Sequence, residues 1–169
     1  MRNTIVNAAP VLGAIALAAA LTSPATAQQD KVKRGEYLAT IMDCSGCHTP
    51  GALTGKPDVA RHLGGSEIGF ELPGLGIFYP PNLTSDRETG LGAWSEGDIM
   101  KAVRTGARPD GRMLAPVMPY HNYGKLIDAD ASALAAYLKS LKPVRNQAPT
   151  IRGAGEKATA PYLTVVMPK

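Results

Sequence analysis

The run from Cys44 to His48, Cys-Ser-Gly-Cys-His, constrains this chain more than any other stretch of its 169 residues. Two cysteines at this spacing lie on one side of a helical turn, where each sulfur can add to a vinyl group of haem. His48 follows Cys47 directly and can reach the iron. The run therefore predicts one covalently attached haem c, held through Cys44 and Cys47, with His48 as an axial ligand of the iron.

Three other uses of two nearby cysteines fit this sequence less well. A thioredoxin-like dithiol is expected after a strand in an alternating β/α pattern, whereas the residues before Cys44 have the pattern of a helix. A zinc site needs about four ligands, and His62 and His121 do not supply the paired spacing of zinc ligands. A disulfide within the run would be short and strained, and it would constrain little of the chain.

The N-terminus has the pattern of a secretory signal. Arg2 supplies a positive charge, residues 11–21 form an apolar run, and residues 25–27, Ala-Thr-Ala, form a small-x-small cleavage site. The apolar stretch is interrupted, and it falls short of the roughly 20 residues that span a membrane. We expect residues 1–27 to be removed on export to the periplasm, with an uncleaved membrane anchor as the alternative.

The mature chain has the length of one domain, and it contains no second apolar run that could cross a membrane. Aromatic residues make up only 5% of the sequence. With so little to bury, we expect the haem to complete the core and the haem-free chain to be largely unfolded. The formal charge of +4 includes Arg2, and the other basic residues are scattered, so nothing indicates nucleic acid as a partner.

Hydrophobic spacing and capping residues predict three helices. The first covers residues 30–43 with Asp30 as its cap, although a start after Gly35 fits equally well. A capping pattern at Ser95 predicts a short helix that ends at Gly106. The clearest helix covers residues 128–141, where Asp128 caps the first turn and a proline follows the last.

The other segments are rich in glycine and proline. Residues 49–93 read as a long loop, in which residues 67–72 and 77–79 could pair as a small hairpin. A haem domain is expected over residues 28–143. Residues 144–169 show no strong period, and we expect them to form an extension that packs on the surface.

The second axial ligand has three candidates. An iron held by one histidine needs another axial group if it is to move electrons without binding a substrate, and a thioether raises its potential. Met118 is the first candidate, because it lies in a loop before the last helix and Pro119 follows it. Met113 lies in the same loop. His121 would make a bis-histidine site with a lower potential.

Several segments together resemble a known family: RGEYL at 34–38, CSGCHTP at 44–50, PNLTSD at 81–86, TGLGAWS at 89–95, MPY at 118–120 and AYLKSL at 136–141. They are similar to class I cytochromes c, and more narrowly to the haem domains in cytochrome subunits of bacterial periplasmic alcohol and gluconate dehydrogenases. The resemblance implies an all-α class I cytochrome c fold, in which three to five helices surround one haem. It also implies that the first and last helices cross, with Gly35 against the Tyr137 end of the last helix. Ser85 replaces a proline that is common in that loop.

The resemblance assigns roles to Met118 and Asn82. Met118 is similar to the axial methionine of the family's Met-Pro motif. Asn82 is a candidate partner of a haem propionate by resemblance. Trp94 is a second candidate by its own chemistry, because a buried indole N–H needs an acceptor, and packing onto the following helix is the alternative.

These residues predict an exported carrier of single electrons, which works between a periplasmic dehydrogenase and a respiratory-chain acceptor such as a terminal oxidase or another cytochrome. No other residues form a catalytic set, so the chain is not expected to be an enzyme. One alternative is a tightly bound electron-transfer subunit of a dehydrogenase complex. A less favoured alternative is a haem enzyme or gas sensor with a displaceable sixth ligand.

Overall fold

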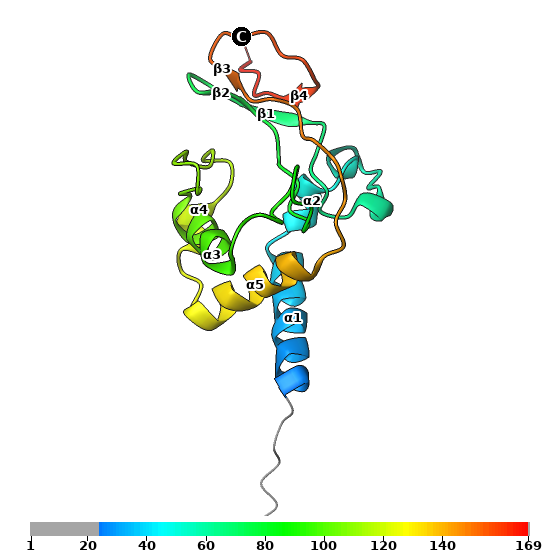
Figure 1. The fold of residues 1–169 in the computed structure, drawn as a ribbon. Helices are drawn as coiled ribbons and strands as arrows, with labels where there is room; N and C mark the ends of the chain where they lie inside the picture. The colour runs from blue at the N-terminus through cyan, green and yellow to red at the C-terminus, as the bar shows by residue number, and fades with distance from the viewer. Residues whose placement is uncertain (1–23, 169) are drawn as a thin grey trace, which may run out of the picture.

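The computed structural model describes residues 24–168, and Figure 1 shows their arrangement. Of the predicted signal peptide, residues 1–27, the first 23 residues lie outside the described part of the chain. Along the chain the elements are α1 (Pro24–Ile41), α2 (Cys44–His48), η1 (Ala52–Thr54), η2 (Val59–Arg61), β1 (Gly69–Leu72), β2 (Gly76–Phe78), α3 (Glu96–Thr105), α4 (Tyr120–Tyr123), α5 (Asp128–Ser140), β3 (Arg152–Gly153) and β4 (Tyr162–Leu163). Within residues 24–168, no helix is long and apolar enough to cross a membrane.

Helices α1 and α5 cross each other in the helical part of the molecule (Figure 1). The crossing places Gly35 against α5, where an added Cβ would collide with the backbone oxygen of Ala133 and with Tyr137. A glycine here lets the two helix backbones approach closely. Beside the crossing, Arg34 Nε forms an ion pair with Asp130 at 2.8 Å. The predicted contact between Gly35 and the Tyr137 end of the last helix is confirmed.

The boundaries of α1 differ from the prediction. The helix begins at Pro24, so Asp30 and Gly35 both lie inside it, and neither predicted start is correct. It ends at Ile41 because the chain turns at Asp43, which has a left-handed φ of 52° that a continuing helix does not contain. This turn separates α1 from α2.

Helix α3 has the predicted caps. Ser95 Oγ accepts a hydrogen bond from Asp98 N at 3.1 Å, and Asp98 Oδ2 accepts one from Ser95 N at 2.9 Å, which together form a capping box. Gly106 follows the helix with a φ of 77°. Asp128, which was expected to cap the last helix, is instead the first residue inside α5, and it forms an ion pair with Arg104 of α3.

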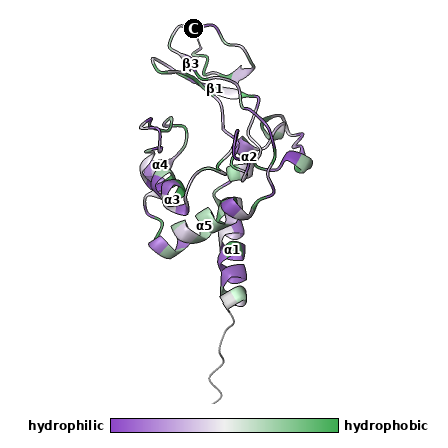
Figure 2. Ribbon diagram, in the orientation of Figure 1, coloured by the Kyte–Doolittle hydropathy of each residue, from purple (hydrophilic) through white to green (hydrophobic). Residues whose placement is uncertain are grey.

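Helix α5 supplies much of the hydrophobic core. Figure 2 shows α1 mainly in the hydrophilic colour, whereas α5 carries more hydrophobic residues. Leu134 and Ala135 of α5 are almost completely buried, and they pack in one cluster with Ile99 of α3 and Cys44 of α2. The helix that carries the cysteines is thus anchored in the same core as α3 and α5.

Residues 69–78 form the predicted hairpin, and the C-terminal extension adds one strand to each of its edges. Strands β1 and β2 pair antiparallel, with Phe70 opposite Phe78. Strand β3 pairs antiparallel with β2, and β4 pairs parallel with β1, so the strand order is β3-β2-β1-β4 (Figure 1). The fold is therefore not the purely all-α fold that the resemblance implied. Strands β3 and β4 could not be expected from the sequence, because two residues are too few to show an alternating pattern.

Candidate haem site

The short helix α2 presents the two cysteines and the histidine. Its cap is Asp43, whose side chain accepts a hydrogen bond from Gly46 N at 3.2 Å. An added Cβ at Gly46 would collide with the Asp43 carboxylate, so the glycine lets the cap fold back on its own helix. The helix is one turn long, and Cys44, Cys47 and His48 all project from it.

Both cysteines have free thiols. Cys44 is buried, and Cys47 is half-buried. Burial, together with the nearby carboxylate of Asp43, raises the pKa of Cys44 to about 11 and also raises the pKa of Cys47. A dithiol redox pair works through a thiolate of lowered pKa, so this environment opposes the thioredoxin-like alternative.

The ring of His48 is held in one orientation by the backbone of Pro81. The distance from His48 Nδ1 to Pro81 O is 2.8 Å, and a carbonyl oxygen can only accept, so Nδ1 carries the ring hydrogen. The other nitrogen, Nε2, is then the one with a free lone pair. His48 is only 8% exposed, and burial lowers its pKa while the bond to Pro81 acts in the opposite direction.

These three side chains fit a covalently attached haem. Two unpaired thiols and one neutral imidazole come from the same helical turn, and the imidazole has its outer hydrogen bond already made. Sequence reasoning did not find Pro81 as the acceptor, because any backbone carbonyl can play this part and the two residues are 33 positions apart.

Asn82 lies next to Pro81, but its side chain is engaged within the protein. It is 1% exposed, and its Nδ2 donates to Val144 O at 2.6 Å and to Thr89 Oγ1 at 3.0 Å. Its Oδ1 accepts a hydrogen bond from Thr84 N at 2.9 Å. Both amide hydrogens therefore have partners within the protein, and these bonds hold the loop in shape. The contact of Asn82 with a haem propionate stays a prediction, and these bonds do not favour it.

Trp94 is half-buried and packs against the core cluster, which includes Ile99 of α3. Its backbone oxygen accepts a hydrogen bond from Lys139 Nζ at 2.8 Å. The guanidinium of Arg108 lies over its indole ring, 5.2 Å from the ring centre. The contact of its N–H with a haem propionate stays a prediction.

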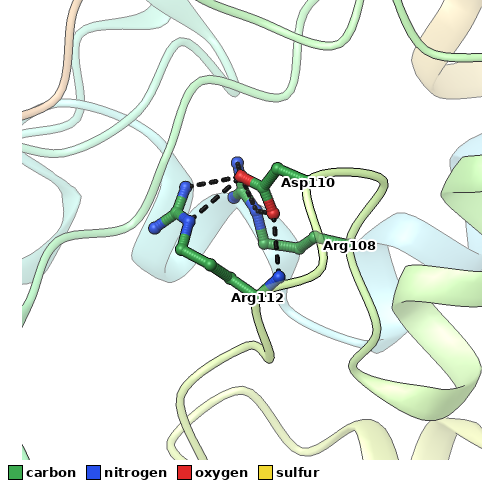
Figure 3. A network of polar contacts seen from close by, with 3 residues as sticks. All are labelled: Arg108, Asp110 and Arg112. Atoms are coloured by element: carbon green, nitrogen blue, oxygen red, sulfur yellow. Dashed lines mark hydrogen bonds and ion pairs between the residues drawn. The ribbon is translucent and has the colours of Figure 1, made fainter.

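A network of three side chains holds Arg108 in this place (Figure 3). Asp110 Oδ2 accepts hydrogen bonds from Arg112 at 2.8 Å and from Arg108 Nε at 3.3 Å, and Oδ1 accepts one from Arg112 N at 3.1 Å. Burial acts to raise the pKa of Asp110, but the bonds from Arg112 and Arg108 outweigh it and lower the pKa to about 2. Sequence reasoning missed this network, although the alternation of Arg, Asp and Arg at positions 108, 110 and 112 was a local signal.

The three candidates for the second axial ligand differ in burial. Met118 is half-buried in the turn before α4, where its N donates to Ala115 O at 2.9 Å. Met113 is 57% exposed, and His121 is exposed. Figure 1 shows α4, which follows Met118, beside α3. An axial sulfur is shielded from water, so burial favours Met118 among the three, and its ligation stays a prediction.

Among curated proteins, this chain is similar to cytochrome subunits of dehydrogenases. It is 38% identical over 146 residues to the cytochrome c subunit of an alcohol dehydrogenase (quinone) from Gluconobacter oxydans, which is 85% of this chain and 29% of the relative. It is 37% identical over 128 residues to the fructose dehydrogenase cytochrome subunit from Gluconobacter japonicus, which is 75% of this chain and 25% of the relative. It is 39% identical over 127 residues to the gluconate 2-dehydrogenase cytochrome c subunit from Pantoea cypripedii, which is 75% of this chain and 26% of the relative. The chain spans less than a third of the length of these relatives.

The family model of cytochrome c matches residues 32–142. The matched range contains α2 with its free thiols, the Pro81 carbonyl that orients His48, and the loop with Met118. The geometry of α2 fits a covalently bound haem, and this match agrees with it. The match also indicates electron transfer. The chain belongs to the cytochrome c family.

Proposed function

We propose that this chain is an exported mono-haem c-type cytochrome, which carries single electrons from a periplasmic dehydrogenase to a respiratory-chain acceptor. The acceptor would be a terminal oxidase or another cytochrome. The hydrogen bond from His48 Nδ1 to Pro81 O carries the proposal, because it leaves Nε2 free for iron on the same turn as two free thiols. The predicted signal peptide, residues 1–27, supports a periplasmic location.

Each residue of the site has one task. Cys44 and Cys47 would each hold the haem through a thioether, formed when the S–H adds across a vinyl double bond. His48 Nε2 and Met118 Sδ would hold the haem iron. Bound haem c supplies an iron that alternates between the ferric and ferrous states. If both residues hold the iron, no position on it would be left for a substrate, which supports a carrier and not an enzyme.

Trp94 is the better of the two candidates for a propionate contact. It lies under the guanidinium of Arg108, whose positive charge would favour a carboxylate nearby. Asn82 is the second candidate, and its hydrogen bonds to Val144 and Thr89 compete with that role.

A second candidate function is favoured by the names of the relatives, several of which are cytochrome subunits of dehydrogenases. In this alternative the chain is a tightly bound subunit that receives electrons inside a complex. Gel filtration of the protein from its own cells, at low and at high salt, separates the two. A free carrier elutes at the size of the single chain, because carriers make small and salt-sensitive contacts, whereas a subunit stays with its dehydrogenase.

Optical spectra of the purified holoprotein test the proposal. We expect haem that stays with the chain after denaturation, a low-spin spectrum in both redox states, and no reaction of the reduced protein with carbon monoxide at neutral pH. If the reduced protein binds carbon monoxide readily, one axial position is open, and a sensing or enzymatic role replaces the carrier.

A further inference from the structure

The C-terminal extension begins by lying against the loop that presents Pro81 to His48. Val144 N donates to Thr84 Oγ1 at 3.1 Å, and Val144 O accepts the bond from Asn82 Nδ2 at 2.6 Å. These bonds join residues that are 60 and 62 positions apart in the sequence. The extension therefore fixes the shape of this loop.

The hydroxyl of Thr89 is the point where the loop and the extension meet. It accepts hydrogen bonds from Asn82 Nδ2 at 3.0 Å and from Asn146 N at 3.1 Å, and it donates to Asp86 Oδ1 at 2.8 Å. A hydroxyl has one hydrogen and two lone pairs, so its whole capacity is used. Removing this one oxygen would leave the donors of Asn82 and Asn146 without this partner.

Asn82 passes the constraint to Pro81 through the backbone. Its side chain is tied to Thr89 and Val144 on one side and to Thr84 N on the other. The carbonyl of Pro81 and the N–H of Asn82 belong to one planar peptide unit. An Asn82 that cannot rotate therefore fixes the direction of the Pro81 carbonyl, which is the acceptor for His48.

The extension also holds the segment that binds the backbone of His48. Asn146 Nδ2 donates to Gly64 O at 2.8 Å, and Gly65 N donates to His48 O at 2.8 Å. An added Cβ at Gly65 would lie 3.0 Å from Asn82 N, so the two segments are in close contact. The extension thus supports His48 through its ring and through its backbone.

We propose that Thr89 and Asn146 are positioning residues for the axial histidine. Thr89 acts through Asn82 on the hydrogen bond between Pro81 and His48, and the Asn146 side chain acts through the Gly64–Gly65 segment, which binds the backbone of His48. This rests on the proposed function, because it takes His48 as a ligand of the haem iron. The hydrogen bond at Nδ1 raises the basicity of a ligating histidine. A more basic ligand favours ferric iron, so loosening the bond raises the midpoint potential.

Thr89→Val tests the inference, because it replaces the hydroxyl by a methyl group of similar shape. In the holoprotein we expect a higher midpoint potential. We also expect the His48 Nδ1 hydrogen to exchange with deuterium faster, measured by NMR, by roughly 2- to 10-fold, the factor for one lost hydrogen bond. Asn146→Ala removes the side-chain bond to Gly64 O and keeps the backbone bond to Thr89, and it should change both quantities in the same direction. Thr89→Ser restores the hydroxyl and should return both to their wild-type values.

Tyr79→Phe is the matched control. Tyr79 Oη donates to Ala160 O at 3.0 Å, so this variant removes a different bond that anchors the extension. It should lower the melting temperature and leave the potential unchanged. Unchanged potential and exchange in both Thr89→Val and Asn146→Ala would overturn the inference and leave the proposed function intact. A wild-type protein without covalent haem, or a spectrum that His48→Ala does not alter, would overturn both.

Discussion

Pro81 O accepts a hydrogen bond from His48 Nδ1 at 2.8 Å, across 33 positions of sequence. The bond decides which ring nitrogen carries the hydrogen and which is free for a metal. Its acceptor is a backbone atom, so it does not depend on the side chain at position 81. The two partners should therefore respond very differently to substitution.

Pro81→Ala should keep the site, whereas His48→Ala should destroy it. Alanine retains the carbonyl, so we expect a low-spin spectrum and a stability lower by about 0.4–1 kcal/mol, because the unfolded chain gains freedom. Without the imidazole, His48→Ala should give a high-spin spectrum and bind carbon monoxide when reduced. Optical spectra and thermal melts of both holoproteins check this. Equal spectral damage in the two variants would mean that position 81 acts through its side chain.

Gly35→Ala should destabilise the crossing of α1 and α5. The added methyl would collide with the backbone of Ala133 and with Tyr137, and neither can move without shifting a helix. We expect a loss of about 1–3 kcal/mol in the free energy of unfolding, as for other overpacked sites. Denaturant unfolding of the holoprotein measures it.

Gly97→Ala is the control for that substitution. Gly97 also lies inside a helix, α3, but the nearest atom to an added Cβ is Ser95 Oγ at 3.7 Å. Gly97 is the second residue of α3, so alanine should stabilise the helix by no more than about 0.5–1 kcal/mol, the cost of a glycine in the middle of a helix. A loss at Gly97 as large as the loss at Gly35 would mean that helix packing is not the cause.

Local signals in the sequence were sufficient for several elements. The boundaries of α3 follow from Ser95 and Gly106, because a capping box and a left-handed glycine act over a few residues. The hairpin follows from two short runs around a turn, with Phe70 opposite Phe78. The crossing at Gly35 came from the family resemblance, because a glycine in a helix does not by itself name its partner.

Apart from this crossing, contacts between distant segments could not be predicted. Strands β3 and β4 have two residues each, and their partners in the hairpin lie far away in the sequence. The Pro81 carbonyl could not be predicted as the acceptor for His48, because every residue has a backbone carbonyl. Asn82 shows a related problem. The sequence shows that Asn82 carries a side-chain donor. That Val144 O and Thr89 Oγ1 accept its hydrogen bonds depends on where the extension lies in the fold.

Met118→Ala should open the second axial position. We expect the oxidised holoprotein to lose the weak absorption band of methionine sulfur on ferric iron, and the reduced holoprotein to bind carbon monoxide. Its midpoint potential should fall, because the thioether is the ligand that raises it. Met113→Ala is the matched control, since this methionine lies in the same loop and is 57% exposed. If Met113→Ala gives these changes and Met118→Ala does not, Met113 is the ligand.

Asp110→Asn should remove a pH-dependent contribution to the free energy of unfolding. The bonds from Arg112 and Arg108 outweigh burial and hold the pKa of Asp110 at about 2 in the folded state, below the value of about 3.9 for an unfolded aspartate. The charged carboxylate therefore stabilises the fold above about pH 4, and this contribution disappears as the pH falls toward about 2. Because the side chain is 42% exposed, we expect a difference of only about 0.2–1 kcal/mol at pH 7. Unfolding of both holoproteins from neutral to acid pH should show this difference closing, and a difference that stays constant would mean that the charge of Asp110 does not stabilise the loop.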